Sequence, residues 1–126
     1  MLESIHHVAI IASDYEKSKH FYTTILELPI IEETYRKDKD SYKLDLKIGE
    51  SQIELFSFPN PPERVNNPEA RGLRHLCFGV KNVKKTVEWL KEKKVACEEV
   101  RMDPVTGKPF TFFKDPDGLP LELYEQ

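Results

Sequence analysis

The stretch HHVAIIASDYEKSKHFY, residues 6–22, decides the fold because its pattern occurs twice in the chain. RHLCFGVKNVKKTVEWL, residues 74–90, has the same order of histidine, apolar run and polar residue before a helical pattern. A shift of 68 residues places His7 on His75 and keeps the apolar positions aligned without a gap. Self-similarity at a fixed offset indicates two copies of one structural unit.

Each copy begins with a predicted strand that is followed by a helix. Residues 5–12 and 74–80 are apolar runs of the length of a buried strand. Asp14 and Asn82 then stand at equivalent positions, and both residue types cap helix N-termini well. The segment after Asp14, residues 15–26, carries apolar side chains at helical spacing. The helix expected after Asn82 also carries apolar side chains at helical spacing.

Further strands follow the helix in both copies, with turns between them. In the first copy the expected strands are 42–48 and 52–58, with a turn at Gly49-Glu50 between them. In the second copy they are FTFF at 110–113 and PLELY at 120–124, with the tight turn DPDG at 115–118 between them. Two strands after each helix are located in this way, and we expect each unit to have the order strand, helix and then three strands. The sequence predicts an α+β fold.

A proline-rich segment separates the two copies. PNPPERVNNPEARG, residues 59–72, holds four prolines and a closing glycine, which disfavour a helix or a central strand. We interpret it as a connector between a first module, 1–58, and a second, 73–126, that together form one compact domain. The connector is either a lid over the site or a rigid spacer.

Composition narrows the function classes. The 126 residues carry a net charge of −3 with no basic cluster, which disfavours binding to nucleic acid or a membrane surface. No apolar run has the length of about 20 residues that spans a bilayer, and no signal peptide pattern opens the chain. Two cysteines are too few for a disulfide framework. We expect a cytoplasmic protein.

The repeat also duplicates a polar pair. The shift that aligns the two histidines places Glu54 on Glu122, so each glutamate follows its histidine by 47 residues. Strand alternation puts each pair on the face opposite the aliphatic side chains, where a carboxylate needs a neutralising partner. Two imidazoles and two carboxylates suit one divalent Zn, Ni, Co, Mn or Fe ion. His6 and His20 lie outside this pattern.

The stretches HHVAIIASDYEKSKHFY, IELFSF, RHLCFGV and DPDGLPLELYE resemble the vicinal oxygen chelate superfamily, the glyoxalase/bleomycin-resistance/dioxygenase group. The resemblance covers nearly the whole chain. It implies two tandem βαβββ modules that form a cupped mixed sheet around a metal site. In the glyoxalase I branch, the ligands lie on the first and last strand of each module. Those positions are His7, Glu54, His75 and Glu122 here.

Four protein ligands on a six-coordinate metal leave two positions, which fit a substrate with vicinal oxygens such as a hemithioacetal. The resemblance therefore implies a lyase or isomerase similar to lactoylglutathione lyase, with Glu122 as the base and Glu54 as its pseudo-symmetric partner. No organic cofactor is evident. An epimerase or dioxygenase of the same superfamily, or a non-catalytic small-molecule binding protein, are the alternatives.

The substrate, expected to be a small molecule such as a thiol adduct, needs further contacts. Candidate residues share a strand face with the glutamates or histidines, or offer a cation: Phe56, Tyr124, Arg36, Arg64 and Cys77. Members of the superfamily often dimerise, so we expect a homodimer. The sequence leaves open whether one chain or two supply the ligands of the metal.

Overall fold

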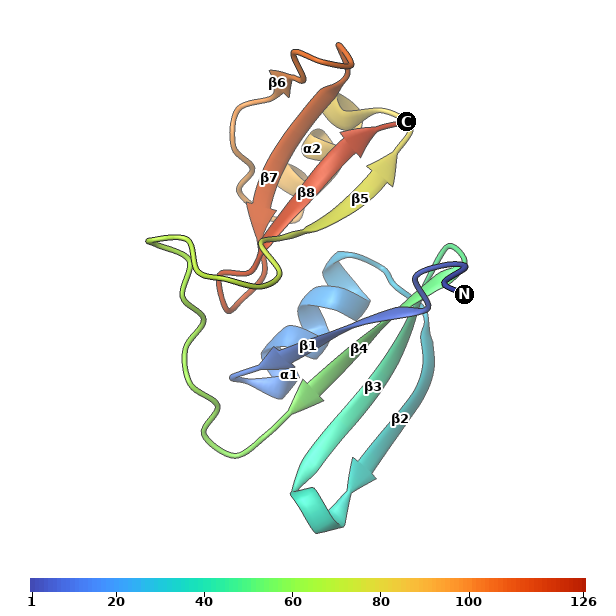
Figure 1. Cartoon of the computed structure of the whole chain (residues 1–126), viewed down its shortest axis with the longest axis vertical. Coiled ribbons are helices and arrows are strands. Elements are labelled where there is room, and N and C mark those ends of the chain that lie inside the picture. The colour runs from blue at the N-terminus through green and yellow to red at the C-terminus, as the bar shows by residue number, and fades with distance from the viewer. The chain divides into compact units, whose positions relative to one another are not determined.

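The computed structural model describes all 126 residues, which form two compact units, Met1–Glu63 and Arg64–Gln126. The boundary between the units falls within residues 59–72, the segment that we interpret as a connector. Residues 58–75 form neither helix nor strand. Each unit consists of a four-stranded sheet and a helical segment (Figure 1).

The first unit follows the predicted order of strand, helix and three strands. Its elements are β1 (His7–Ala12), α1 (Tyr15–His20), the π-helical turn η1 (Phe21–Ile25), β2 (Ile30–Arg36), the short 3₁₀ turn η2 (Lys37–Lys39), β3 (Ser41–Ile48) and β4 (Ser51–Ser57). The strands are arranged in the order β1-β4-β3-β2. Strand β1 runs parallel to β4, and the other pairs are antiparallel.

The second unit repeats this topology. Its elements are β5 (Leu76–Val80), α2 (Val83–Glu92), β6 (Arg101–Met102), β7 (Pro109–Lys114) and β8 (Pro120–Glu125). The strand order β5-β8-β7-β6 matches that of the first sheet, with β5 parallel to β8. The predicted α+β fold of two βαβββ modules is confirmed.

The repeat extends to the pairing register of the strands. In the first sheet Ala9 lies opposite Glu54, and in the second Cys77 lies opposite Glu122. These two pairs are related by the same 68-residue shift that the sequence shows. The offset therefore describes a structural duplication in which both glutamates occupy the same place in their sheets.

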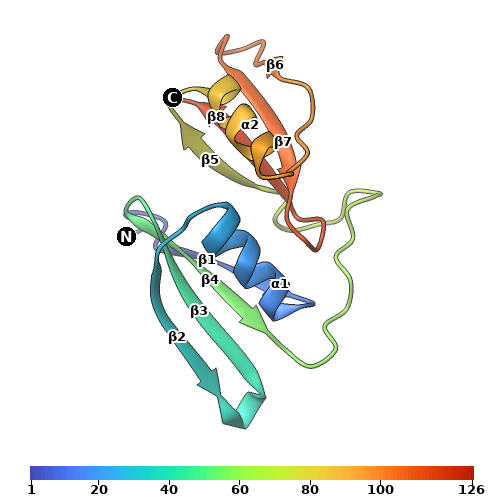
Figure 2. The ribbon, with the colours of Figure 1, turned by 180° about the vertical axis from the view of Figure 1, so that it is seen from behind.

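Each helix covers the aliphatic face of its own sheet. In the first unit Leu44, Leu55 and Tyr22 are fully buried, and α1 crosses this face of the sheet (Figure 2). In the second unit Leu90 of α2 and Leu121 of β8 are fully buried. The opposite face of each sheet is left for the polar pairs. No helix of the chain combines the length and apolar character needed to cross a membrane.

The helix caps form as the sequence predicts. The side chain of Asp14 accepts a hydrogen bond from the backbone N–H of Lys17, and that of Asn82 accepts one from Lys85. A second acceptor, the carboxylate of Glu125, receives the Val83 N–H at 3.0 Å. These bonds satisfy N–H groups that have no partner within the helix.

Two strands have no clear signal in the sequence. Strand β2 is a sheet edge on which most residues are exposed, so its sequence IIEETYR lacks the alternation of a half-buried strand. Strand β6 has only two residues. The sequence indicates three strands after each helix, but the positions of these edge strands come from the structure.

A cluster of polar side chains links α1 to the edge strand β2, and it leads to a prediction about stability. The carboxylate of Glu33 accepts hydrogen bonds from the nearly buried Tyr15 hydroxyl at 2.5 Å and from Lys19 Nζ at 2.9 Å. The bond from Tyr15, and then that from Lys19, lowers the pKa of Glu33. A carboxyl whose pKa is lower in the folded state stabilises the fold above its unfolded pKa, and this contribution is lost as the pH falls through the folded pKa.

We therefore expect Glu33→Gln to lower the free energy of unfolding by about 1–2 kcal/mol at pH 7. The difference from the parent protein should begin to shrink below about pH 4 and vanish once the pH falls below the lowered pKa of Glu33, where the parent carboxyl is itself protonated. Urea unfolding of the variant and the parent protein at several pH values measures this difference in the free energy of unfolding. Glu32→Gln on the same strand is the control, and an equal loss in both variants would contradict the assignment.

Candidate functional site

The first predicted pair lies on neighbouring strands of the first sheet. His7 is the first residue of β1, and Glu54 is in the middle of β4. Nδ1 of His7 lies 3.5 Å from Oε2 of Glu54. The Glu54 side chain is only 13% exposed, whereas that of His7 is 42% exposed. The imidazole of His6 contacts that of His7 edge-on, with 3.0 Å between their Nδ1 atoms.

The second predicted pair has the same layout. His75 immediately precedes β5, and its Nε2 lies 2.9 Å from Oε2 of Glu122 on β8. Glu122 is 12% exposed, which is close to the value for Glu54. The ring of Phe112 packs edge-to-face against the imidazole of His75 at 5.1 Å. This contact restricts how the ring can turn.

The surroundings of the two glutamates differ in charge. In the first unit Lys43 Nζ lies 3.8 Å from Glu54 Oε2 and 3.0 Å from Asp45 Oδ1. The hydrogen bond to Asp45 raises the pKa of Lys43, so the lysine stays charged. In the second unit Phe112 lies opposite Glu122, where Asp45 lies opposite Glu54. No lysine or arginine forms an ion pair with Glu122.

Cys77 has the position in the second unit that Ala9 has in the first. Burial of the thiol and the charge of Glu122 raise the pKa of Cys77 to about 11. The residue is therefore a neutral thiol at physiological pH, beside the carboxylate of Glu122.

The donor set of the two pairs fits a divalent metal. Each unit supplies one imidazole nitrogen and one largely buried carboxylate, side by side on the sheet face opposite the helix. Nitrogen and oxygen donors together suit the borderline ions Zn²⁺, Ni²⁺, Co²⁺ and Fe²⁺, as well as Mn²⁺. No group of three or more His, Cys, Asp or Glu side chains comes together as a metal site.

Two of the predicted substrate contacts meet in the first unit. The guanidinium carbon of Arg36 lies 4.8 Å from the ring centre of Phe56 and 5.5 Å from that of Phe58. The two phenyl rings are themselves stacked. Arg36 also donates a hydrogen bond to the Ser41 hydroxyl at 2.8 Å.

Tyr124 lies on the face of β8 that also carries Glu122, as predicted, but its hydroxyl already has two partners. It donates to Asp103 Oδ2 at 2.8 Å and is in short contact with the Thr106 hydroxyl. Asp103 and Thr106 belong to the loop that joins β6 and β7. In this arrangement the phenol anchors that loop, so only the ring face of Tyr124 is free of polar contacts.

Arg64 binds the connector to the second unit. Its guanidinium donates hydrogen bonds to the carbonyls of Leu73 and Arg74 and to the side chain of Asn66. Asn66 in turn donates to the carbonyl of Gly118. These contacts give Arg64 a structural role within the unit that contains it.

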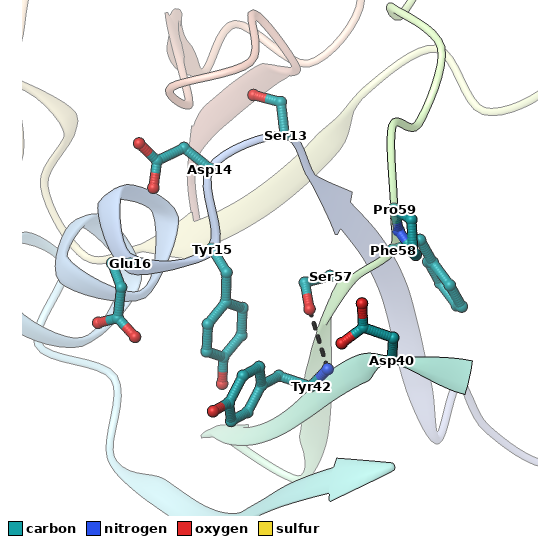
Figure 3. Close-up of a pocket in the computed structure, with 9 residues that line it drawn as sticks. All are labelled: Ser13, Asp14, Tyr15, Glu16, Asp40, Tyr42, Ser57, Phe58 and Pro59. Atoms are coloured by element: carbon teal, nitrogen blue, oxygen red, sulfur yellow. Dashed lines mark hydrogen bonds between the residues drawn. The ribbon is translucent and has the colours of Figure 1, made fainter. Parts of the chain in front are cut away.

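The sequence did not indicate a hollow on the helix side of the first unit. Its volume is about 500 Å³, and it is lined by Ser13, Asp14, Tyr15, Glu16, Asp40, Tyr42, Ser57, Phe58 and Pro59 (Figure 3). The rings of Tyr15 and Tyr42 stack there at 4.8 Å. None of the four predicted metal ligands lines the hollow. Asp14, which does line it, already caps α1 by accepting a hydrogen bond from the Lys17 N–H.

Lys43, Asp45 and Phe58 were missed as neighbours of the predicted site. Strand alternation alone places Lys43 and Asp45 on one face of the strand predicted at 42–48, but it does not say which residue of the next strand lies opposite. The observed register supplies that information, because Asp45 lies opposite Glu54 and Lys43 opposite Phe56.

Comparison with known proteins identifies the family. The Glyoxalase/Bleomycin resistance protein/Dioxygenase superfamily model matches residues 4–123. The chain therefore belongs to this superfamily, which confirms the family resemblance found in the sequence. A solved glyoxalase family protein from Enterococcus faecalis has a TM-score of 0.92 and 46% identity, and the match covers 98% of both chains.

Relatives with similar sequences extend this result. Protein YwkD of Bacillus subtilis is 61% identical, over 100% of this chain and 99% of its own length. Human mitochondrial methylmalonyl-CoA epimerase is 31% identical, over 97% of this chain and 73% of the epimerase. The metallothiol transferase FosB of Staphylococcus saprophyticus is also 31% identical, over 98% of this chain and 78% of FosB. The superfamily relatives thus include enzymes with different reactions.

Proposed function

We propose that the protein is a metal-dependent lyase or isomerase, similar to glyoxalase I, that moves a proton on a small substrate with vicinal oxygens. The observation that carries the proposal is the duplicated pair, His7 with Glu54 and His75 with Glu122, at equivalent register positions of the two sheets. These four residues would hold one divalent ion, with both pairs from one chain or from two copies of it. Size-exclusion chromatography with light scattering tests the homodimer that we also propose.

A bound divalent ion would supply Lewis acidity that stabilises negative charge on the substrate oxygens while a carbon-bound proton leaves. The chain's own contribution is to place carboxylates where they can take and return that proton. His75 holds Glu122 through the 2.9 Å contact, and Phe112 packs edge-to-face against the imidazole. A carboxylate in a partly dry site is a suitable general base.

Glu122 is the better candidate for the base. Lys43 lies 3.8 Å from Glu54, so the carboxylate of Glu54 has a second electrostatic partner besides His7. Glu122 has only His75 as an ionic partner. A carboxylate with fewer attachments can reorient toward a substrate more readily. In this proposal Glu54 mainly holds the metal, and Glu122 also moves the proton.

Epimerisation is the second candidate, favoured by the 31% identity to methylmalonyl-CoA epimerase over 97% of this chain. The chemistry is closely related, because removal of a proton beside a carbonyl and its return on the other face inverts the carbon. Two carboxylates at equivalent positions, Glu54 and Glu122, would suit one removal and one return.

The decisive experiment measures proton transfer with defined substrates. The purified protein is analysed for metal, stripped, and reloaded separately with Ni²⁺, Zn²⁺, Co²⁺, Mn²⁺ or Fe²⁺. Each form is then incubated in D₂O with hemithioacetals of methylglyoxal with several thiols, and with methylmalonyl-CoA. NMR follows product formation and deuterium at the reacting carbon.

We expect turnover of a hemithioacetal with at least one metal and none in the stripped protein. Deuterium exchange into methylmalonyl-CoA alone would favour the epimerase. If no loaded form exchanges a proton in any substrate, the proposed chemistry is wrong and a binding protein or another reaction takes its place.

A further inference from the structure

In the first unit, two donors at the start of β4 hold the segment that leads into β1. The backbone N–H of Gln52 donates to the His6 carbonyl at 3.0 Å, and the Ser51 hydroxyl donates to the Ile5 carbonyl at 2.9 Å. The parallel pairing of β1 with β4 then begins with His7 opposite Gln52. His7 is therefore a residue of the strand, and the two residues before it are fixed to β4.

The second unit lacks both donors. The 68-residue shift places Leu119 on Ser51, and a leucine side chain has no group that donates a hydrogen bond. The shift also places Pro120 on Gln52, and proline has no backbone N–H. The pairing of β5 with β8 accordingly begins one residue later than that of β1 with β4. His75 is therefore left outside β5, just before its first residue.

Arg64 of the connector supplies the missing hydrogen bonds. Its Nη2 donates to the Leu73 carbonyl at 2.9 Å and to the Arg74 carbonyl at 3.0 Å. The 68-residue shift equates these two carbonyls with those of Ile5 and His6, which β4 holds in the first unit. One guanidinium thus replaces a hydroxyl and a backbone N–H.

The same arginine is linked to the strand that carries Glu122. Its Nε donates to the side-chain oxygen of Asn66, and Asn66 donates to the Gly118 carbonyl at 2.8 Å. Gly118 belongs to the turn before β8, and the connector runs beside this turn (Figure 1). The starts of β5 and β8 are therefore tied together. His75 is the next residue after the carbonyls that Arg64 holds, and its Nε2 lies 2.9 Å from Glu122.

We propose that Arg64 is a positioning residue of the metal site, which keeps the imidazole of His75 beside the carboxylate of Glu122 by holding the two carbonyls before His75. The inference rests on the proposed function, because it takes both residues as metal ligands. In this proposal residues 64–74 of the connector support the second His–Glu pair. That role is distinct from the role of a lid or of a plain spacer.

The first test uses the protein without metal. Arg64→Met removes every donor of the side chain and retains its length, and thermal unfolding verifies that the variant folds. We expect the backbone amides of residues 74–80 to exchange with D₂O about 3- to 10-fold faster than in the parent protein, because the start of β5 opens more readily. Arg71→Met, at an exposed arginine of the same connector, is the matched control and should exchange like the parent.

The second test measures metal binding without turnover. Competition with a chromophoric chelator gives the affinity for Zn²⁺, and the visible absorption of the Co²⁺ form reports the geometry of the ligands. We expect Arg64→Met to bind Zn²⁺ about 10-fold more weakly, at the lower end of the effect of a residue that orients a ligand, and to change the Co²⁺ spectrum. Arg71→Met should match the parent. A purely structural role would lower the melting temperature and leave both readouts of the folded protein unchanged.

Two further variants test whether the lost hydrogen bonds are the cause. Arg64→Lys retains an ammonium group that can donate to both carbonyls, so it should recover part of the affinity for Zn²⁺. Pro120→Gln gives β8 the backbone N–H that Gln52 provides in the first unit. Combined with Arg64→Met, it should bind Zn²⁺ more tightly than Arg64→Met alone. Pro120→Gln by itself should bind like the parent.

Two results would overturn the assignment. One is an Arg64→Met protein that binds Zn²⁺ as tightly as the parent, whatever its rate of amide exchange. The other is a loss of affinity that neither Arg64→Lys nor the added Pro120→Gln restores. A parent protein that binds no divalent ion refutes the proposed metal site itself. A parent that binds Zn²⁺ together with an Arg64→Met variant that binds it equally well refutes the role of Arg64 alone.

Discussion

We expect Glu122→Gln to reduce kcat for hemithioacetal turnover by roughly 10²–10⁴-fold, which is the usual contribution of a positioned general base. The amide has nearly the shape of the carboxylate and can still offer an oxygen beside His75, but it cannot accept a proton at neutral pH. Steady-state kinetics on the metal-loaded variant, with metal content measured in the same sample, separates a lost base from a lost ion.

Glu54→Gln is the matched comparison, since Glu54 is equivalent to Glu122 under the 68-residue shift and is almost equally buried. Its effect on kcat in the loaded form should be much smaller, because in the parent protein Lys43 and His7 both contact the Glu54 carboxylate and we assign Glu54 mainly to metal binding, not to proton transfer. If the two variants lose activity equally with full metal content, the proton passes through both carboxylates. That result favours the epimerase type of chemistry.

The fold was accessible from the sequence because its main signals are local. Strands β1 and β5 were located because they are continuous apolar runs, and Asp14 and Asn82 cap the helices as expected. The expectation that both strands are buried was wrong: each lies at an edge of its sheet, and no residue of β5 is buried. The edge strands were located less well because their side chains are mostly exposed and carry no burial period, as on β2. A π-helical turn over Phe21–Ile25, within the helix predicted for 15–26, has no sequence signal of its own.

The two His–Glu pairs were accessible because duplication makes a rare coincidence visible: both contacts, 3.5 Å and 2.9 Å, join residues that the 68-residue shift equates. The residues around the two pairs could not be predicted from the sequence, because they depend on which residues face one another across strands. The pairing of β7 with β8 places Phe112 opposite Glu122, whereas the pairing of β3 with β4 places Asp45 opposite Glu54. The stacking of Arg36 on Phe58 depends in the same way on side-chain reach beyond the end of β4.

We expect His7→Ala and His75→Ala each to weaken binding of the divalent ion by more than about 100-fold, since loss of even an indirect partner of a metal ligand costs 10- to 100-fold. The two losses should be of similar size, because the histidines occupy equivalent places beside equally buried glutamates. Competition with a chromophoric chelator measures the affinity for Zn²⁺ or Ni²⁺, and circular dichroism verifies folding. A loss confined to one variant would contradict a site built from both pairs.

His6→Ala is the sharpest control for this prediction, because His6 is adjacent to His7 and contacts its ring, with 3.0 Å between the Nδ1 atoms. The 68-residue shift equates His6 with Arg74, which pairs with Glu69, so the second unit has no imidazole at this position. We expect its removal to change the affinity for the metal by no more than a few fold. An equal loss on removal of either neighbour would mean that His7 acts through local packing, and the duplicated pairs would then be strand contacts and not ligands.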